Sequence, residues 1–222
     1  MASKKGLKSR AVGFYPSKAD FAAQSAFVSD TLEPLVLKAE KGLIELFFMD
    51  ASHFVMGGFA GRVWSKVRKW IKTPSGRKRY NVLGALNFVT KRMEIVANET
   101  YITGTQVIEM LNLLQTQYTD KIIKIVLDRA AYHRCGAVTT HAASLGIELV
   151  FLPPYSPNLN LIERVWKLVK SNVLNAAYTE TFSGFKQKID DCIKSFDGAL
   201  KEKMIALITP KFQLFNKCSI ID

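Results

Sequence analysis

The chain has 222 residues, 48% of them hydrophobic, a length that suits one sizeable domain and is short for two. No apolar run approaches the roughly 20 residues of a membrane-spanning helix, which argues against a membrane partner. The first ten residues, MASKKGLKSR, lack the apolar stretch of a secretory signal, and the three cysteines are widely spaced and odd in number. These features favour the reducing cytoplasm over a disulfide or zinc framework.

The net charge of +12 is concentrated in one segment of the chain. Residues 51–93 contain no Asp or Glu but ten Lys or Arg residues, interleaved with Trp64, Trp70 and Tyr80. A block of one charge sign with aromatics is typical of a surface that binds a nucleic-acid backbone. The phosphate contacts that we predict in this segment are Arg62, Lys66, Lys69, Lys72, Arg77, Lys78 and Arg79. The alternatives are a solvated basic face or a surface that binds an acidic protein.

The first half of the chain predicts a lead-in, a helical segment and three strands. Residues 1–15 form a basic lead-in rich in Gly and Ser, and residues 16–40 have helical spacing, with Pro34 as the point where the helix splits. Residues 43–49 form a short apolar strand that ends in Asp50. Two further strands, 80–89 and 93–97, are joined by a turn.

The second half alternates helices with strands. Helical spacing occurs at residues 103–118, 131–145, 161–174 and 182–196, and apolar strands at 121–127 and 147–152. Strands separated by helical crossovers pair in parallel, so the fold class is α/β: a mixed five-stranded sheet of three antiparallel strands and then parallel βα units, flanked by helices. The predicted domain spans residues 16–199, followed by a tail at 200–222 without a clear pattern.

Three acids occupy the ends of these elements. Asp50 and Asp128 each follow an apolar strand, and Glu163 lies in the first turn of a helix. Because the carboxyl ends of parallel strands border the ligand crevice of an open sheet, acids placed there can converge. Three carboxylates without a His or Cys ligand set suit a hard cation such as Mg²⁺ or Mn²⁺. Two such ions would clamp the attacking and leaving oxygens of a phosphoryl displacement.

Each acid also has a purely structural interpretation. Asp50 and Asp128 can begin turns, and Asp128 can cap the following helix. Asn160 and Glu163 have the spacing of a capping box, and Glu163 and Lys167 that of a helical ion pair. The residues alone leave both interpretations open.

Four segments carry a family resemblance: FFMDASHF (47–54), SGRKRYNVLGALN (75–87), IVLDRAAYHR (125–134) and LVFLPPYSPNLNLIERVWKLVK (149–170). Together they resemble the catalytic domain of DDE transposases of the mariner superfamily, in its bacterial insertion-sequence branch. The resemblance implies a ribonuclease H-like fold and identifies Asp50, Asp128 and Glu163 as the catalytic metal ligands, with two Mg²⁺ (or Mn²⁺) ions as cofactors. It implies nicking of DNA at element ends and transfer of the 3′-hydroxyls into target DNA at TA sites.

The resemblance also implies partners. These are the terminal repeats of the element, target DNA and a second copy of the chain in a homodimeric synaptic complex, in the cytoplasm at the nucleoid of a bacterium. The further DNA contacts that we predict are His133, Arg134, Tyr155, Lys167 and Lys170. Two of them have structural alternatives: a hydrogen bond for His133 and packing within its turn for Tyr155.

The chain departs from the family pattern at three positions. Arg129 stands where such families usually place Asn after the second Asp, and Asn158 and Leu161 replace an acid and a proline in the turn. A helix-turn-helix region for the terminal repeats is also missing, so we expect an excised catalytic domain, the downstream product of a two-frame element or a truncated copy. The alternative functions are another ribonuclease H-like nuclease, such as a ribonuclease H or a junction resolvase, and a catalytically silent DNA-binding remnant.

Overall fold

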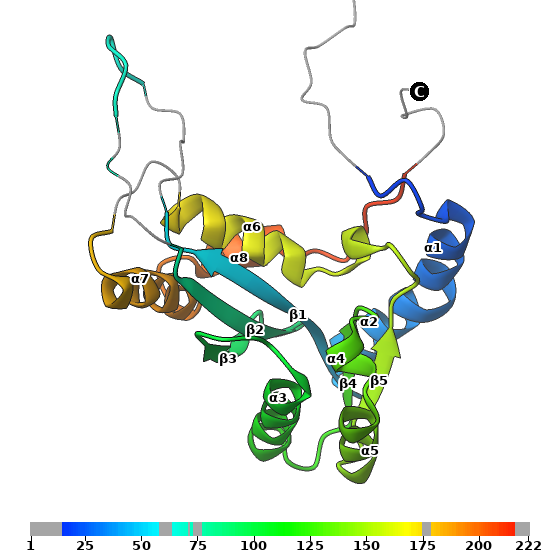
Figure 1. Ribbon diagram of the computed structural model, residues 1–222. Coiled ribbons are helices and arrows are strands. Elements are labelled where there is room, and N and C mark those ends of the chain that lie inside the picture. The colour runs from blue at the N-terminus through cyan, green and yellow to red at the C-terminus, as the bar shows by residue number, and fades with distance from the viewer. Residues whose placement is uncertain (1–14, 58–63, 71, 73–76, 175–178, 216–222) are drawn as a thin grey trace, which may run out of the picture.

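A mixed five-stranded sheet forms the centre of the molecule (Figure 1). The computed structural model describes residues 15–57, 64–70, 72, 77–174 and 179–215. The strands are β1 (Glu45–Val55), β2 (Arg79–Asn87), β3 (Met93–Asn98), β4 (Ile123–Leu127) and β5 (Glu148–Phe151), in the sheet order β3-β2-β1-β4-β5. β1 pairs antiparallel with β2, and β2 with β3, whereas β4 pairs parallel with both β1 and β5. The predicted mixed sheet is thereby confirmed.

Helices cover both faces of this sheet (Figure 1). They are α1 (Phe21–Phe27), α2 (Glu33–Glu40), α3 (Gly104–Gln117), α4 (Ala131–Arg134), α5 (Gly136–Ser144), α6 (Ile162–Val173), α7 (Phe182–Lys194) and α8 (Lys201–Leu207). Buried residues of α2, α6, α7 and α8 form one hydrophobic core, and those of α3 and α5 form the other. Side chains alternate along a strand, so Phe48 and Phe54 of β1 join the core under α6, while Phe47 and Met49 join the core under α3. Asp50 is two residues from Phe48 along the same strand, so it lies on the face of the sheet that α6 covers.

Strand β1 is longer than the predicted strand that ends in Asp50. It continues to Val55 because β2 pairs with it along this length, as far as the pair Val55 and Arg79. The parallel pairing of β1 with β4 ends at Phe48 and Val126. Two residues further along each chain, that register places Asp50 level with Asp128. Asp50 therefore lies inside a strand whose parallel neighbour has already ended.

The N-terminal helical segment continues past Pro34, contrary to the predicted split. It begins after Asp20, whose carboxylate accepts hydrogen bonds from the amides of Ala22 and Ala23. A π-helical turn (Val28–Leu32) then joins α1 to α2. Proline lacks an N–H and its ring crowds the carbonyl four residues earlier, and the wider π-helical turn just before Pro34 accommodates both effects.

The predicted helix at 131–145 is two helices. Between α4 and α5, Cys135 has an extended backbone with φ −64° and ψ 146°. The Cys135 side chain packs closely on the start of α3, where a Cβ on Gly104 would lie 2.9 Å from its Sγ. The chain therefore turns at Cys135 before α5 packs along α3.

The other predicted elements agree with the structure to within a few residues. Thr103 caps α3 together with Gln106. Residues after 200, for which no pattern was clear, form α8, and Met204 and Ile208 are buried in the same core as α6. The lead-in at 1–15 lies almost wholly outside the described residues, and the proposed division into domains stays a prediction. Within the described chain, no helix combines the length and apolar character needed to cross a bilayer.

Candidate active site

The three acids singled out in the sequence line one pocket, with a volume of about 550 Å³. Asp50 comes from the middle of β1, Asp128 follows the last residue of β4, and Glu163 lies in the first turn of α6. Arg129 and the turn at 152–157 complete most of the wall. Sheet register and helix packing thus bring together three carboxylates that are far apart in the sequence.

Asp50 carries the strongest electrostatic perturbation in this pocket. Burial, and then the negative charges of Glu163 and Asp128, raise the pKa of Asp50 from 3.8 to about 8. The amide of Ala51 and the charge of Lys170 act in the opposite direction but do not compensate. Glu163 and Asp128 are therefore both close enough to Asp50 to disfavour its charge. The oxygen-donor chemistry of the three carboxylates fits a hard divalent cation, although no three Asp, Glu, His or Cys side chains of the described residues already converge as a metal cage.

Asp128 is held by hydrogen bonds from the residues that follow it. Its Oδ1 accepts from the amide of Ala130 at 3.0 Å and lies 2.7 Å from Nδ1 of His133. An ionised carboxylate only accepts hydrogen bonds, so Nδ1 carries the hydrogen. The hydrogen bond from His133, partly opposed by burial, lowers the pKa of Asp128. Asp128 is thus ionised and oriented, whereas Asp50 resists ionisation.

His133 is a structural hydrogen-bond donor in this fold, the alternative that the sequence left open. Its side chain is fully buried, so it presents no surface to DNA. The Tyr132 ring packs edge-on against it, with the ring centroids 4.4 Å apart. Within the described residues, Nε2 of His133 has no hydrogen-bond partner.

The start of α6 does not follow either structural interpretation of Glu163. The residue before the helix is Leu161, already in helical conformation, and no side chain caps the helix. Asn160 instead donates from Nδ2 to the carbonyl of Met49 at 3.0 Å, so the predicted capping box is wrong. Among the described residues, no ion pair joins Glu163 to Lys167. Asn160 therefore ties the helix that carries Glu163 to the strand residue before Asp50.

Gly84 of β2 pairs with Asp50 of β1 in the sheet register. Because Gly84 has no side chain, α6 can lie close to the sheet at this point. A Cβ on Gly84 would lie 2.8 Å from two ring carbons of Trp166 and 2.7 Å from Cε of Met93. Trp166 is 1% exposed and thus lies in the core, and Phe54 packs edge-on against it. The backbone of β1 and the axis of α6 are consequently held close at the level of the pocket.

Hydrogen bonds connect the proline-rich turn before α6 to the N-terminal helix α1. Tyr155 has a positive φ of 56°, and its carbonyl accepts a hydrogen bond from the buried Gln24 at 3.4 Å. Oε1 of Gln24 accepts in turn from Nδ2 of Asn158 at 2.9 Å. The Tyr155 ring itself is half-exposed, with Nζ of Lys18 at 5.8 Å from its centroid.

The predicted DNA-binding residues other than His133 lie at exposed positions wherever the structure describes them. Lys167 and Lys170 follow Glu163 at helical spacing on the outer side of α6, and Arg134 is exposed at the end of α4. The predicted contacts that are exposed in the connection between β1 and β2, including the first residue of β2, are Lys66, Lys69, Lys72, Arg77, Lys78 and Arg79. Arg62 lies outside the described residues.

Residues 64–70 of that connection stand away from the sheet (Figure 1). Trp64 and Trp70 are almost wholly exposed there, and the guanidinium of Arg68 lies 4.2 Å from the centroid of the Trp70 ring.

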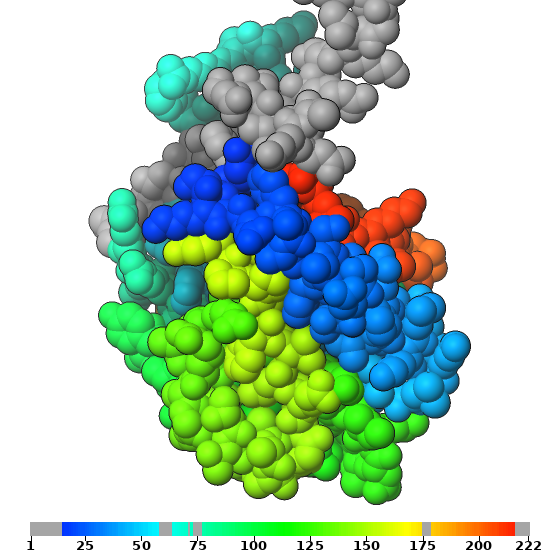
Figure 2. Space-filling view, turned by 90° about the vertical axis from the view of Figure 1, so that its right-hand side faces the viewer, coloured from blue at the N-terminus to red at the C-terminus, as the bar shows by residue number. Residues whose placement is uncertain are grey.

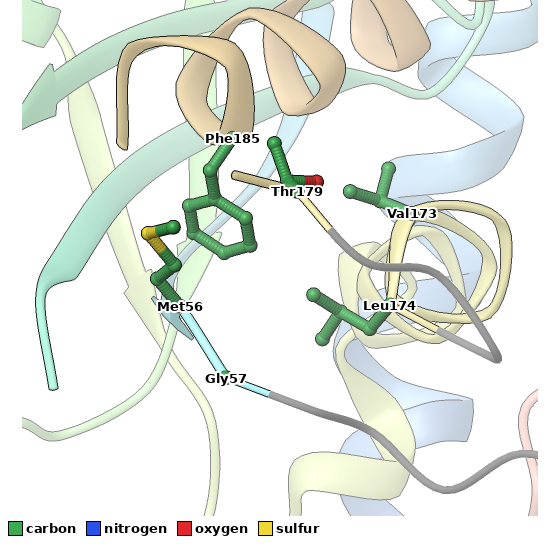
Figure 3. A pocket seen from close by; sticks show the side chains of 6 residues that line it. All are labelled: Met56, Gly57, Val173, Leu174, Thr179 and Phe185. Atoms are coloured by element: carbon green, nitrogen blue, oxygen red, sulfur yellow. The ribbon is translucent and has the colours of Figure 1, made fainter. Parts of the chain in front are cut away.

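A second pocket, of about 10 Å³, lies where this connection begins, between the end of β1 and helices α6 and α7 (Figure 3). It has room for about one water molecule, and none of its lining residues is ionisable.

Comparison with known proteins identifies the family. The model of the DDE superfamily endonucleases matches residues 45–186, and a comparison with curated proteins finds no match. Similar solved structures include the mariner Mos1 paired-end complex with Mg (TM-score 0.65, 14% identity, covering 95% of this chain and 68% of that chain) and the Mos1 strand transfer complex (0.61, 13%, 96% and 68%). The catalytic domain of Mos1 mariner transposase is also similar (0.53, 14%, 91% and 100%).

At these identities the structural likeness shows the ribonuclease H-like fold of a transposase catalytic core, as predicted. The family model covers well over half of the chain and includes all three acids of the pocket. The chain belongs to the DDE superfamily endonucleases.

Proposed function

We propose that this chain is a transposase catalytic domain that nicks DNA at the ends of a mobile element and joins the 3′-hydroxyls to target DNA. The observation that carries the proposal is the meeting of Asp50, Asp128 and Glu163 in one pocket, where burial and the charges of the other two acids raise the pKa of Asp50. The endonuclease family supports the nicking step. The likeness to a strand transfer complex supports the joining step.

In this proposal Asp50, Asp128 and Glu163 hold two Mg²⁺ or Mn²⁺ ions. When bound, these ions activate water or a 3′-hydroxyl as the nucleophile and stabilise the leaving oxygen of the scissile phosphate. The chain positions two of the three acids directly: pairing of β1 with β2 fixes the backbone at Asp50, and His133 orients Asp128. The similar Mos1 complexes with Mg and with Mn support the choice of cation.

DNA would approach along the exposed basic side chains around the pocket. Lys167 and Lys170 continue from Glu163 on one side of α6, because residues four and seven positions further along a helix lie on the same face. Such contacts neutralise backbone phosphates and position the duplex without reading its sequence. A homodimer that holds two element ends agrees with the Mos1 paired-end complexes. TA target sites and membership of the bacterial insertion-sequence branch stay predictions.

The nicking step can be tested on supercoiled plasmid, which needs no knowledge of the terminal repeats. We expect the chain to nick the plasmid with Mn²⁺ or Mg²⁺, and Asp50→Asn, Asp128→Asn and Glu163→Gln each to lower the rate at least about 100-fold. A labelled RNA–DNA hybrid is offered in parallel. Cleavage of the hybrid alone would identify a ribonuclease H, and nicking by Glu163→Gln at the wild-type rate would remove Glu163 from the mechanism.

The joining step needs a separate measurement. A labelled oligonucleotide duplex with a recessed 3′-hydroxyl is incubated with plasmid, and covalent transfer of the label to the plasmid is followed. Transfer that requires both the free 3′-hydroxyl and the three acids supports the transposase. Nicking without transfer, also when the oligonucleotide carries the ends of the element, would reduce the proposal to an endonuclease.

A further inference from the structure

Arg129 is a cation inside the acidic pocket that is not paired with an acid. It follows Asp128 directly, is exposed and lines the pocket together with the three carboxylates. An arginine beside carboxylates commonly forms short, bidentate ion pairs with them. Within the described part of the chain Arg129 forms no ion pair.

The side chain of Arg129 is nevertheless held in place by a hydrogen bond. Its Nε donates to the carbonyl of Leu152 at 3.0 Å, and Leu152 is buried at the end of β5. The carbonyl of Arg129 accepts from Nε of Arg134 at 2.8 Å, which holds the backbone of the same residue. The two terminal amino groups of Arg129 have no hydrogen-bond partner among the described residues. A guanidinium that is anchored through Nε and open at its other end is arranged to receive a ligand.

Two functions are possible for such a group: a counter-charge to the acids or a contact to substrate. The geometry argues against the first, because no carboxylate of the described residues lies within ion-pair distance of Arg129. Asp128, its neighbour in the chain, accepts hydrogen bonds from His133 and the amide of Ala130 instead. Arg129 therefore shares the pocket with the acids without neutralising them.

We propose that the terminal amino groups of Arg129 bind a DNA phosphate beside the scissile one and thereby set the position of the strand in the pocket. This inference rests on the proposed function and names a substrate contact for it. The planar guanidinium matches two phosphate oxygens, and its fixed charge needs no partner within the protein. A lysine at this position would keep the charge but would lack both the Nε–H donor to Leu152 and the two-pronged contact.

The test measures binding of a fluorescent DNA duplex over a series of salt concentrations, with Ca²⁺ in place of Mg²⁺. For Arg129→Ala we expect weaker binding and a salt slope smaller by about 1, the loss expected for one phosphate contact. Arg129→Lys should keep the slope but nick plasmid more slowly than wild type. Lys121→Ala is the charge control, since Lys121 is exposed beyond the opposite end of β4 and should leave slope and nicking unchanged.

Mn²⁺ binding to the DNA-free protein separates the two functions of Arg129. A phosphate contact predicts that Arg129→Ala leaves Mn²⁺ affinity unchanged, whereas a counter-charge predicts tighter Mn²⁺ binding without any change in salt slope. The second result, or an unchanged slope for Arg129→Ala, overturns the inference. Thermal unfolding of each variant shows that it is folded. Failure of the proposed function appears elsewhere, as absence of nicking by the wild-type chain.

Discussion

Asp50 occupies a position in the pocket at which an ionised carboxylate is unfavourable in the absence of a ligand. Its carboxyl lies in a largely buried strand beside Glu163 and Asp128, so ionisation is unfavourable in the folded chain. A bound divalent cation would reverse this effect by attracting all three carboxylates. Asp50, whose ionised form is disfavoured in the folded chain, is thus the residue expected to gain most from a bound cation.

The first prediction concerns the stability of Asp50→Asn. The folded protein holds the Asp50 proton up to about pH 8, whereas the unfolded chain releases it near pH 3.8, so stability falls as the pH rises between these values. Without metal, Asp50→Asn should have nearly wild-type stability at pH 4 and exceed it by on the order of 2–4 kcal/mol at pH 8. Thermal unfolding at both pH values measures this.

Metal provides the control for that experiment. Mn²⁺ at pH 8 should raise the melting temperature of the wild-type chain and leave that of Asp50→Asn nearly unchanged, because a ligand stabilises only a state that binds it. Equal stabilisation of both proteins would show that Asp50 is not a ligand.

His133 gives the second prediction at this scale. His133→Ala removes a buried ring and the donor to Asp128, which should cost about 2–4 kcal/mol of stability and lower plasmid nicking. In His133→Asn, the side-chain amide can occupy the place of Nδ1 and donate to Asp128. Nicking should therefore recover more in His133→Asn than in His133→Ala at a temperature where both are folded. Equal nicking by the two variants would assign His133 to packing alone.

At the scale of elements, the pocket depends on how α6 sits against β1. Gly84 permits the close approach of Trp166, and Asn160 bonds to the carbonyl of Met49. Both contacts lie next to an acid: Gly84 pairs with Asp50, and Asn160 precedes the helix turn of Glu163. The distance between strand and helix therefore sets the separation of two of the three carboxylates.

Gly84→Ala tests this dependence. The added Cβ would press on the Trp166 ring and on Met93, which should destabilise the protein by about 1–3 kcal/mol and displace α6. Nicking should fall by a larger factor than the folded fraction does, since Glu163 moves with the helix. Gly136→Ala is the matched control: its Cβ would meet nothing within 4 Å, and it should be neutral or stabilising by up to about 1 kcal/mol.

At the scale of the whole molecule, the two ends of the described chain pack against each other and are hydrogen-bonded to the turn that lines the pocket. Tyr15, Phe21 and Phe215 form a cluster of three rings with centroid separations of 5.5–5.8 Å. Figure 2 shows the red C-terminal segment beside the blue α1. Asn158 in the turn before α6 donates both to Gln24 and to the carbonyl of Gln213. The turn is thus held from both ends of the described chain.

Arg164 makes the corresponding contact from α6. Its guanidinium donates to the carbonyls of Leu207 and Thr209 at 3.2 Å and to that of Lys211. Arg164→Met should destabilise the protein by about 1–3 kcal/mol and increase amide exchange in residues 207–213. Arg92→Met, which removes an exposed ion pair to Asp197, should change stability by less than about 1 kcal/mol. A similar loss in both variants would contradict the role of Arg164.

The order of elements and the convergence of the acids could be predicted from the sequence, because apolar periodicity and strand order depend on local pattern. The position of Asp50 inside β1 could not, since the strand is prolonged by pairing with β2, a distant segment. The hydrogen bond of Asn160 to Met49 was missed because the local spacing of a capping box satisfied the pattern. Likewise, the burial of His133 follows from packing across α4, which no local pattern around His133 indicates.

The fastening of both described ends beside the pocket has a practical consequence for attaching probes. Pro16 lines the pocket, and Phe215 packs on Tyr15 next to it. A fusion protein or surface tether joined directly to residue 15 or residue 215 would thus be attached near the opening of the pocket. The turn between α3 and β4 lies at the opposite end of the sheet and is exposed at Lys121. A fluorophore or tether attached at that turn would report on the protein while keeping the opening accessible.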